Sequence, residues 1–120
     1  EIFSLKGEKF FRNIEEKITL KILKQKQKVV ISLGGGAFLN KNIQKEILNN
    51  HISFWLYCDD KTLIQRIKNS HKRPIASNLT NHELTNLIKK RSNIYSKALY
   101  KIDCNKQTKI KIANKIIDYL

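Results

Sequence analysis

Arg12 is the first residue whose neighbours suggest chemistry. Glu15 and Glu16 follow it by three and four residues, and side chains at those spacings meet on one face of a helix. One interpretation is an ordinary exposed ion pair, which contributes under ~0.5 kcal/mol. The other is an arginine that a carboxylate holds in position for a ligand. Arg12 and Glu15 are therefore candidate binding residues.

A second arginine, Arg91, lies three residues after Ile88 and four before Tyr95. This spacing puts Arg91 on or beside the apolar stripe of its helix. A guanidinium there needs a carboxylate, because burying an unpaired charge is costly. The carboxylate belongs either to the protein, in a structural ion pair, or to a ligand. A side chain that extends its charged end into solvent is a third possibility.

Three consecutive glycines, Gly34, Gly35 and Gly36, follow a short apolar run. Glycines leave backbone N–H groups accessible and give a ligand room to approach closely. A tight turn between a strand and a helix would explain the same residues.

The segment His71-Lys72-Arg73-Pro74 places two cations beside the only proline of the chain. It is either a solvated loop or a mobile lid. A lid of this kind brings an arginine to a phosphoryl group in transfer, where the charge accelerates the reaction by orders of magnitude.

Apolar patterns predict the elements that position these residues. Short apolar runs are typical of buried parallel strands, and apolar residues at every third or fourth position are typical of amphipathic helices. Strands are expected at 28–33, 52–57 and 100–103. Helices are expected at 8–26, after Asn40, after Asp59 or Asp60, at 83–99 and at 108–120, with a loop at 69–81. Strands that alternate with helices predict an α/β fold: one domain, residues 1–120, with a parallel sheet and helices on both faces.

The composition restricts the class of protein. Net charge is +14, from 24 Lys and Arg against 10 Asp and Glu, which suggests a polyanionic partner. A coding bias towards lysine would also explain this charge. Cys58 and Cys104 show no metal-site spacing, so free thiols in a reducing cytosol are expected, without a disulfide or a metal. No apolar run approaches the ~20 residues that span a bilayer.

Five segments, taken together and in order, resemble the shikimate kinase family. They are FRNIEE, SLGGGAF, KRPIA, RSNIYSKAL and IDCN, which match the family's FRxxE motif, glycine-rich stretch, lid, R-x-x-x-Y-x-x-A helix and V-D-T/C-N strand end. Each is weak evidence alone, but the ordered set covers the whole chain. Ile75 and Ala76 replace the two leucines that usually follow the lid proline, so the packing of the lid is expected to differ.

The resemblance implies a P-loop fold of the nucleoside-monophosphate-kinase type. It implies transfer of the γ-phosphoryl group of ATP to the 3-hydroxyl of shikimate, a step of chorismate and aromatic amino acid biosynthesis. By this resemblance Arg12 and Arg91 bind the shikimate carboxylate, which suits a two-pronged guanidinium. Glu15 orients Arg12, and Gly35 with its glycine neighbours contacts a shikimate hydroxyl.

The resemblance also assigns residues to the nucleotide. Arg73 becomes the lid arginine that contacts the phosphates and takes part in catalysis. Arg66 matches an arginine that packs on adenine in some members. Gln107 falls near the end of the loop that contacts adenine.

The family's opening strand, GxxGxGK[ST] loop and D-x-D segment do not occur in these 120 residues. The loop carries the phosphate-binding amides and the Mg²⁺ ligand, so the 120 residues alone are expected to be inactive. The missing strand is the centre of the family's 2-3-1-4-5 sheet, between 28–33 and 52–57. These two runs are expected either to pair directly or to expose apolar edges that favour aggregation.

Other functions remain open at this point. The chain could be a non-catalytic module that keeps only shikimate contacts. A small basic nucleic-acid-binding protein is less favoured, because most of the aromatic residues sit within apolar strands or stripes and are not interleaved with basic residues. The expected partners are shikimate and ATP, with Mg²⁺ held by the segment not present. Nucleic acid and membrane are not expected, and the full-length protein is expected to be a monomer. The expected location is the cytoplasm, or the plastid stroma if the source has plastids.

Overall fold

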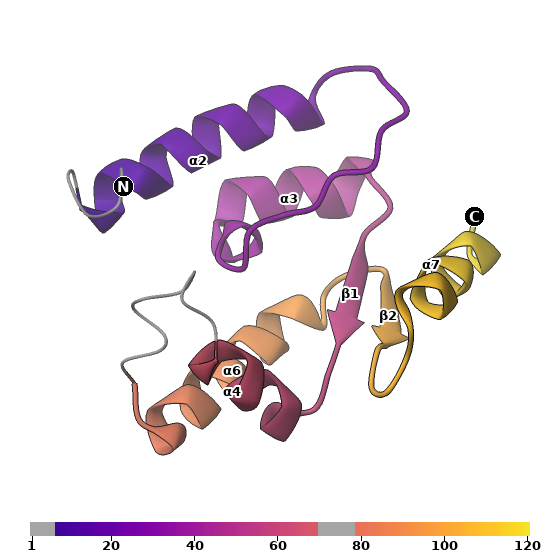
Figure 1. The fold of residues 1–120 in the computed structure, drawn as a ribbon. Coiled ribbons are helices and arrows are strands. Elements are labelled where there is room, and N and C mark those ends of the chain that lie inside the picture. Colours follow the sequence, from indigo (N-terminus) through magenta and orange to yellow (C-terminus); the bar gives the residue numbers. More distant parts are fainter. Residues whose placement is uncertain (1–6, 70–78) are drawn as a thin grey trace. The chain divides into compact units, whose positions relative to one another are not determined.

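The computed structural model describes residues 7–69 and 79–120, and the chain forms two compact units, Glu1–Ile52 and Ser53–Leu120 (Figure 1). The first unit contains helix α2 (Glu8–Leu23), the short helix η1 (Ala37–Leu39) and helix α3 (Lys41–Asn50). The second contains strand β1 (Phe54–Tyr57), helices α4 (Asp60–Lys68) and α6 (Asn81–Tyr95), strand β2 (Tyr100–Asp103) and helix α7 (Lys109–Asp118).

The first unit is held together by contacts of α2 and η1 with α3. Its most buried side chains are those of Leu23, Ala37, Phe38, Ile43 and Ile47. Ile43 and Ile47 are one helical turn apart, so α3 presents a single apolar face. Asn40 begins α3, as expected, because its side chain accepts hydrogen bonds from the backbone N–H groups of Asn42 and Ile43.

The predicted strand at 28–33 is wrong. These residues form no strand, and Val29 and Val30 are 57% and 100% exposed. A parallel strand is stable only when a neighbouring strand takes its backbone N–H and C=O groups. The sheet in the described residues consists of β1 and β2 alone, so the direct pairing of 28–33 with 52–57 does not occur. The apolar character of a run therefore does not decide that it becomes a strand.

The second unit is built on a parallel pair of strands. Phe54 pairs with Tyr100 and Tyr57 with Asp103, so both strands end at the same edge. Alternate residues of a strand point to opposite faces. On one face Ile102 packs against Ile112 and Ile116 of α7, and on the other Trp55 contacts the ring of Tyr95 in α6, with centroids 6.2 Å apart. The expected α/β architecture, a parallel sheet with helices on both faces, is confirmed.

Side-chain caps set where the helices of the second unit begin. Asp59 caps α4 and Thr108 caps α7 through hydrogen bonds to backbone N–H groups three residues further on. Thr80 and Glu83 form a capping box, in which each side chain accepts a hydrogen bond from the other's backbone N–H. Helix α6 therefore begins at Asn81, two residues before the expected start, and the predicted loop is shorter at this end.

Among the helices of the described residues, none is long and apolar enough to cross a bilayer.

Candidate functional site

Arg12 lies on α2 in a defined orientation. Its Nη1 donates a 2.8 Å hydrogen bond to Oε1 of Glu15, one turn further along the helix. Glu15 is the more buried partner, with a side-chain exposure of 15% against 35% for Arg12. Glu8 lies on the other side, with its Oε1 4.0 Å from Nε of Arg12. A partly buried carboxylate thus holds the guanidinium, while the Arg12 side chain as a whole stays partly exposed. This arrangement matches the positioned arginine that the sequence suggested as one alternative.

The glycine turn lies directly against this pair. A Cβ atom on Gly36 would be 2.6 Å from both Nη1 and Nη2 of Arg12, and one on Gly34 would be 3.5 Å from Oε2 of Glu15. The first distance is a severe overlap and the second is an ordinary contact. Gly36 has φ −100° and ψ −9°, a conformation open to any residue. Glycine is needed at position 36 for space, because the guanidinium occupies the place of the missing side chain.

Contacts between helices of the first unit support this turn. Nδ2 of Asn42 in α3 donates a 2.7 Å hydrogen bond to Oε1 of Glu16 in α2. This bond, with a weaker contribution from Asn40, lowers the pKa of Glu16. The turn itself is closed by backbone hydrogen bonds from Ala37 to Gly34 and from Leu39 to Gly36. Glu15 and Glu16 therefore have separate roles: Glu15 orients Arg12, while Glu16 joins α2 to α3.

Arg91 lies on α6, in the second unit. Its Nε is buried and has no hydrogen-bond partner. In the part of the chain that the structure describes, no carboxylate forms an ion pair with Arg91, so the structural ion pair is not observed. A buried guanidinium N–H without a partner is costly. Arg91 is therefore suited to receive a carboxylate from a ligand.

Arg66 and Gln107 are both tied to the carboxyl edge of the β1–β2 pair. Arg66 donates from Nη1 to Sγ of Cys58, the residue after β1, at 3.6 Å. The backbone N–H of Gln107 bonds to the carbonyl of Cys104, the residue after β2, at 3.4 Å. This edge is where parallel α/β sheets bind ligands.

Asn105, the last residue of the IDCN segment, also belongs to this edge, although the sequence analysis gave its side chain no role. Its Oδ1 accepts a 2.9 Å hydrogen bond from the backbone N–H of Asp59, and so joins the segment after β2 to the start of α4. Lys106, next in the chain, has φ +52°, which makes the turn before Gln107 sharp. The sequence offered one signal for a turn at this point: an asparagine shortly after a predicted strand, because Asn is common in turns.

Arg73 and residues 70–78 of the predicted lid lie outside the described residues. The two ends of that segment are described: Nζ of Lys68 donates a 2.6 Å hydrogen bond to the carbonyl of Leu79.

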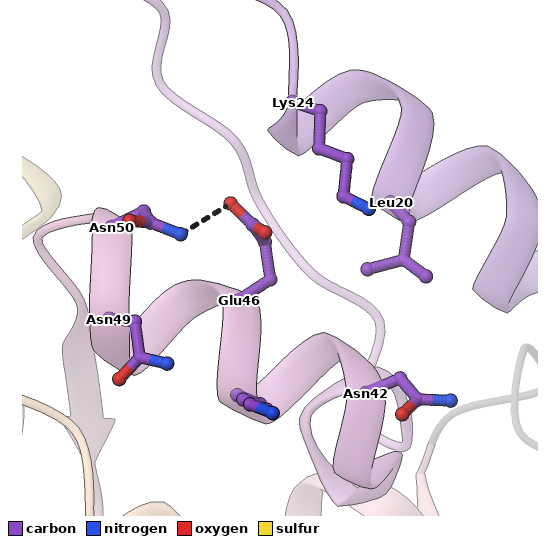
Figure 2. Close-up of a pocket in the computed structure, with 7 residues that line it drawn as sticks. Leu20, Lys24, Asn42, Glu46, Asn49 and Asn50 are labelled. Carbon is purple, nitrogen blue, oxygen red and sulfur yellow. Dashed lines mark hydrogen bonds between the residues drawn. The ribbon is translucent and has the colours of Figure 1, made fainter.

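A cleft of about 360 Å³ lies between α2 and α3, and Figure 2 shows the side chains that line it. Its lining residues are Leu20, Lys24, Asn42, Lys45, Glu46, Asn49 and Asn50. None of the predicted site residues lines this cleft. Glu46 is already engaged by Nδ2 of Asn50 at 3.1 Å and by Nε2 of His51 at 3.2 Å. The cleft is therefore separate from the candidate site around Arg12.

No cluster of three or more His, Cys, Asp or Glu side chains suited to a metal ion occurs in residues 7–69 and 79–120.

Comparison with known proteins identifies the family of this chain. The sequence profile of the shikimate kinase family matches residues 1–120. The chain is 35% identical over 118 residues to a shikimate kinase from Bartonella henselae, covering 98% of this chain and 56% of that protein. It is 38% identical over 121 residues to one from Oceanobacillus iheyensis, covering 100% of this chain and 66% of that protein. The chain thus spans between about half and two thirds of the length of these relatives.

The fold is also similar to a solved structure. The crystal structure of shikimate kinase from Bacteroides thetaiotaomicron aligns with a TM-score of 0.76 at 23% identity, over 98% of this chain and 70% of that one. A parallel α/β unit with helices on both faces defines the general class. Within it, this chain belongs to the shikimate kinase family.

Proposed function

We propose that this chain is the shikimate-binding and lid portion of an enzyme that transfers the γ-phosphoryl group of ATP to the 3-hydroxyl of shikimate. The observation that carries the proposal is the guanidinium of Arg12, which Glu15 holds at 2.8 Å against Gly36. A guanidinium that is already held in place binds a ligand carboxylate without first having to be ordered. Membership of the family supports the proposed reaction, and the position of Arg12 against Glu15 and Gly36 supports the binding role proposed for it.

Shikimate carries one carboxylate, and the proposed ligands for it are Arg12 and Arg91. Two observations support this: the Arg12 side chain is partly exposed beside Glu15, and Nε of Arg91 is buried without a hydrogen-bond partner. Bidentate contacts from guanidinium groups fix the orientation of a carboxylate as well as binding it. A fixed carboxylate fixes the ring, and so places the hydroxyl that attacks the phosphoryl group.

ATP would lie at the carboxyl edge of β1 and β2. Arg66 and Gln107 are the proposed contacts for the adenine, since both are anchored to the residues that follow these strands. Arg73 of the lid is the proposed contact for the transferring phosphate. When bound, Mg²⁺ would neutralise charge on the phosphates. Its ligands are proposed to lie on the family's phosphate-binding loop.

The substitution Arg91→Lys tests the carboxylate role. It should be made in the protein extended by the N-terminal phosphate-binding segment of its family. Lysine keeps the charge but cannot supply a two-pronged contact, and a charge-assisted hydrogen bond contributes about 1.5–3 kcal/mol. Shikimate affinity, measured by calorimetry, should fall about 10- to 100-fold, while ATP affinity stays the same.

Lys90→Arg, at the exposed neighbouring position on α6, is the matched control and should bind shikimate as the parent does. Unchanged shikimate affinity in Arg91→Lys would reject the carboxylate role.

A further inference from the structure

Cys58 and Cys104 are the residues that directly follow strands β1 and β2. The strand register ends with Tyr57 opposite Asp103, so the next pair in this register is Cys58 and Cys104. The backbone N–H of Cys104 donates to the carbonyl of Tyr57 at 2.8 Å, which is the last bond of the ladder. Beyond it, the N–H of Asp59 bonds to the side chain of Asn105, so Cys58 and Cys104 follow directly on the last paired residues. Neighbouring strands are about 4.8 Å apart, and disulfides join residues whose Cα atoms are about 4.4–6.8 Å apart.

The two thiols also share one environment. Cys58 and Cys104 are 6% and 7% exposed and belong to one buried cluster with Ile102. Adjacent register positions of parallel strands point to the same face of the sheet. Burial raises the pKa of the Cys104 thiol, and the neighbouring Cys58 raises it further. The register and the shared buried cluster therefore both favour a short separation between the two thiols.

From this geometry we infer that Cys58 and Cys104 are a site of reversible oxidation, forming an intramolecular disulfide across the ends of β1 and β2. The oxidant is a low-molecular-weight disulfide such as oxidised glutathione. One protein thiolate attacks a sulfur of the oxidant and releases one glutathione thiolate, leaving a mixed disulfide. The second protein thiolate attacks the protein sulfur of that mixed disulfide and releases the second glutathione. The two protein thiols lose two electrons, the oxidant gains them, and the two released thiolates take up the two protons.

Both cysteines border segments that carry proposed nucleotide contacts. Asp59, the cap of α4, follows Cys58, and the turn through Lys106 to Gln107 follows Cys104. Arg66 donates a hydrogen bond to the sulfur of Cys58, so oxidation changes the acceptor that holds this arginine. In the reduced chain, the hydrogen bond from Asp59 to Asn105 links the start of α4 to the turn after β2. The disulfide would add a covalent link between the same two segments.

The experiment is incubation of the native chain with oxidised glutathione, followed by unfolding, alkylation of free thiols and intact-mass measurement. The chain has only two cysteines, so an unalkylated monomer that has lost two hydrogens contains this disulfide and no other. We expect that species to form without denaturant and to revert with dithiothreitol. Because the disulfide closes a loop of about 46 residues, the oxidised chain should also melt higher, by on the order of 10 °C.

Cys58→Ser and Cys104→Ser, each leaving one thiol, are the matched variants. Each should form at most a mixed disulfide with glutathione and should show no oxidant-dependent rise in melting temperature. The inference is overturned if the native chain keeps two free thiols under excess oxidant. It is also overturned if it forms only mixed disulfides or covalent dimers, or if the bond forms only in denaturant.

Discussion

Replacing Gly36 with alanine separates binding from stability at the candidate site. The added Cβ would lie 2.6 Å from Nη1 and Nη2 of Arg12 and 2.7 Å from Cζ, so the guanidinium must move. It is the far end of a flexible, partly exposed side chain, and the backbone at position 36 already suits alanine. The lost ion pair contributes about 0–1 kcal/mol. The reduced freedom of the unfolded chain contributes about 0.4–1 kcal/mol in the opposite direction. The free energy of unfolding should therefore change by less than about 1 kcal/mol.

Ligand affinity should respond much more strongly. If Arg12 swings away from Glu15, the shikimate carboxylate loses an ordered charge-assisted contact of about 1.5–3 kcal/mol. Shikimate binding in the extended protein, measured by calorimetry, should weaken about 10- to 100-fold. Gly34→Ala would place its Cβ 3.5 Å from Oε2 of Glu15, an ordinary contact, so this variant should leave the hydrogen bond between Arg12 and Glu15 in place. Its shikimate affinity should therefore fall less than that of Gly36→Ala.

A double-mutant cycle tests whether the two effects have one cause. If Gly36 acts by leaving room for Arg12, then Gly36→Ala should cause no further loss of affinity in a protein that already carries Arg12→Ala. Normal shikimate binding by Gly36→Ala, or fully additive losses in the double variant, would refute this explanation.

Three further predictions concern the second unit and the lid. Thr80→Ala removes one half of the capping box and should lower the free energy of unfolding by about 1 kcal/mol in denaturant melts, with Thr85→Ala inside α6 as the control. Hydrogen bonds from Thr62 and Thr80, the backbone N–H groups first, lower the pKa values of Asp59 and Glu83 below the ordinary 3.8 and 4.5. Because the pKa of each carboxyl group is lower in the folded state, each group stabilises the fold above its ordinary pKa. That stability is lost as the pH falls through the folded-state pKa. Acid melts of Asp59→Asn and Glu83→Gln should therefore show a weaker pH dependence than the parent. In the extended protein, Arg73→Ala should reduce kcat more than shikimate affinity, because a cation beside the phosphate matters most in the transition state; an unchanged kcat would reject that role.

Local interactions explain what was predictable from the sequence. Asn40, Asp59 and Thr108 cap helices because each side chain reaches backbone N–H groups only two or three residues away. The strand at 100–103 was predicted with its observed bounds. The pairing of Arg12 with Glu15 follows from the period of a helix. The capping box of Thr80 and Glu83 was equally visible as a Thr-x-x-Glu pattern, and it was missed.

Only the tertiary structure decided what depends on distant residues. Residues 28–33 have the apolar, β-branched character of a strand, yet they form none, because strand hydrogen bonds need a neighbour that the residues themselves cannot supply. Arg12 and Gly36 are far apart in the chain, and the packing of α2 on η1 and α3 is what sets the guanidinium against the glycine. Likewise, Cys58 and Cys104 become neighbours only because β1 and β2 pair in one register. Helix periods and caps depend on residues within a few positions of one another. Strand pairing and contacts such as that of Arg12 with Gly36 depend instead on residues that are distant in the sequence and meet only in the folded chain.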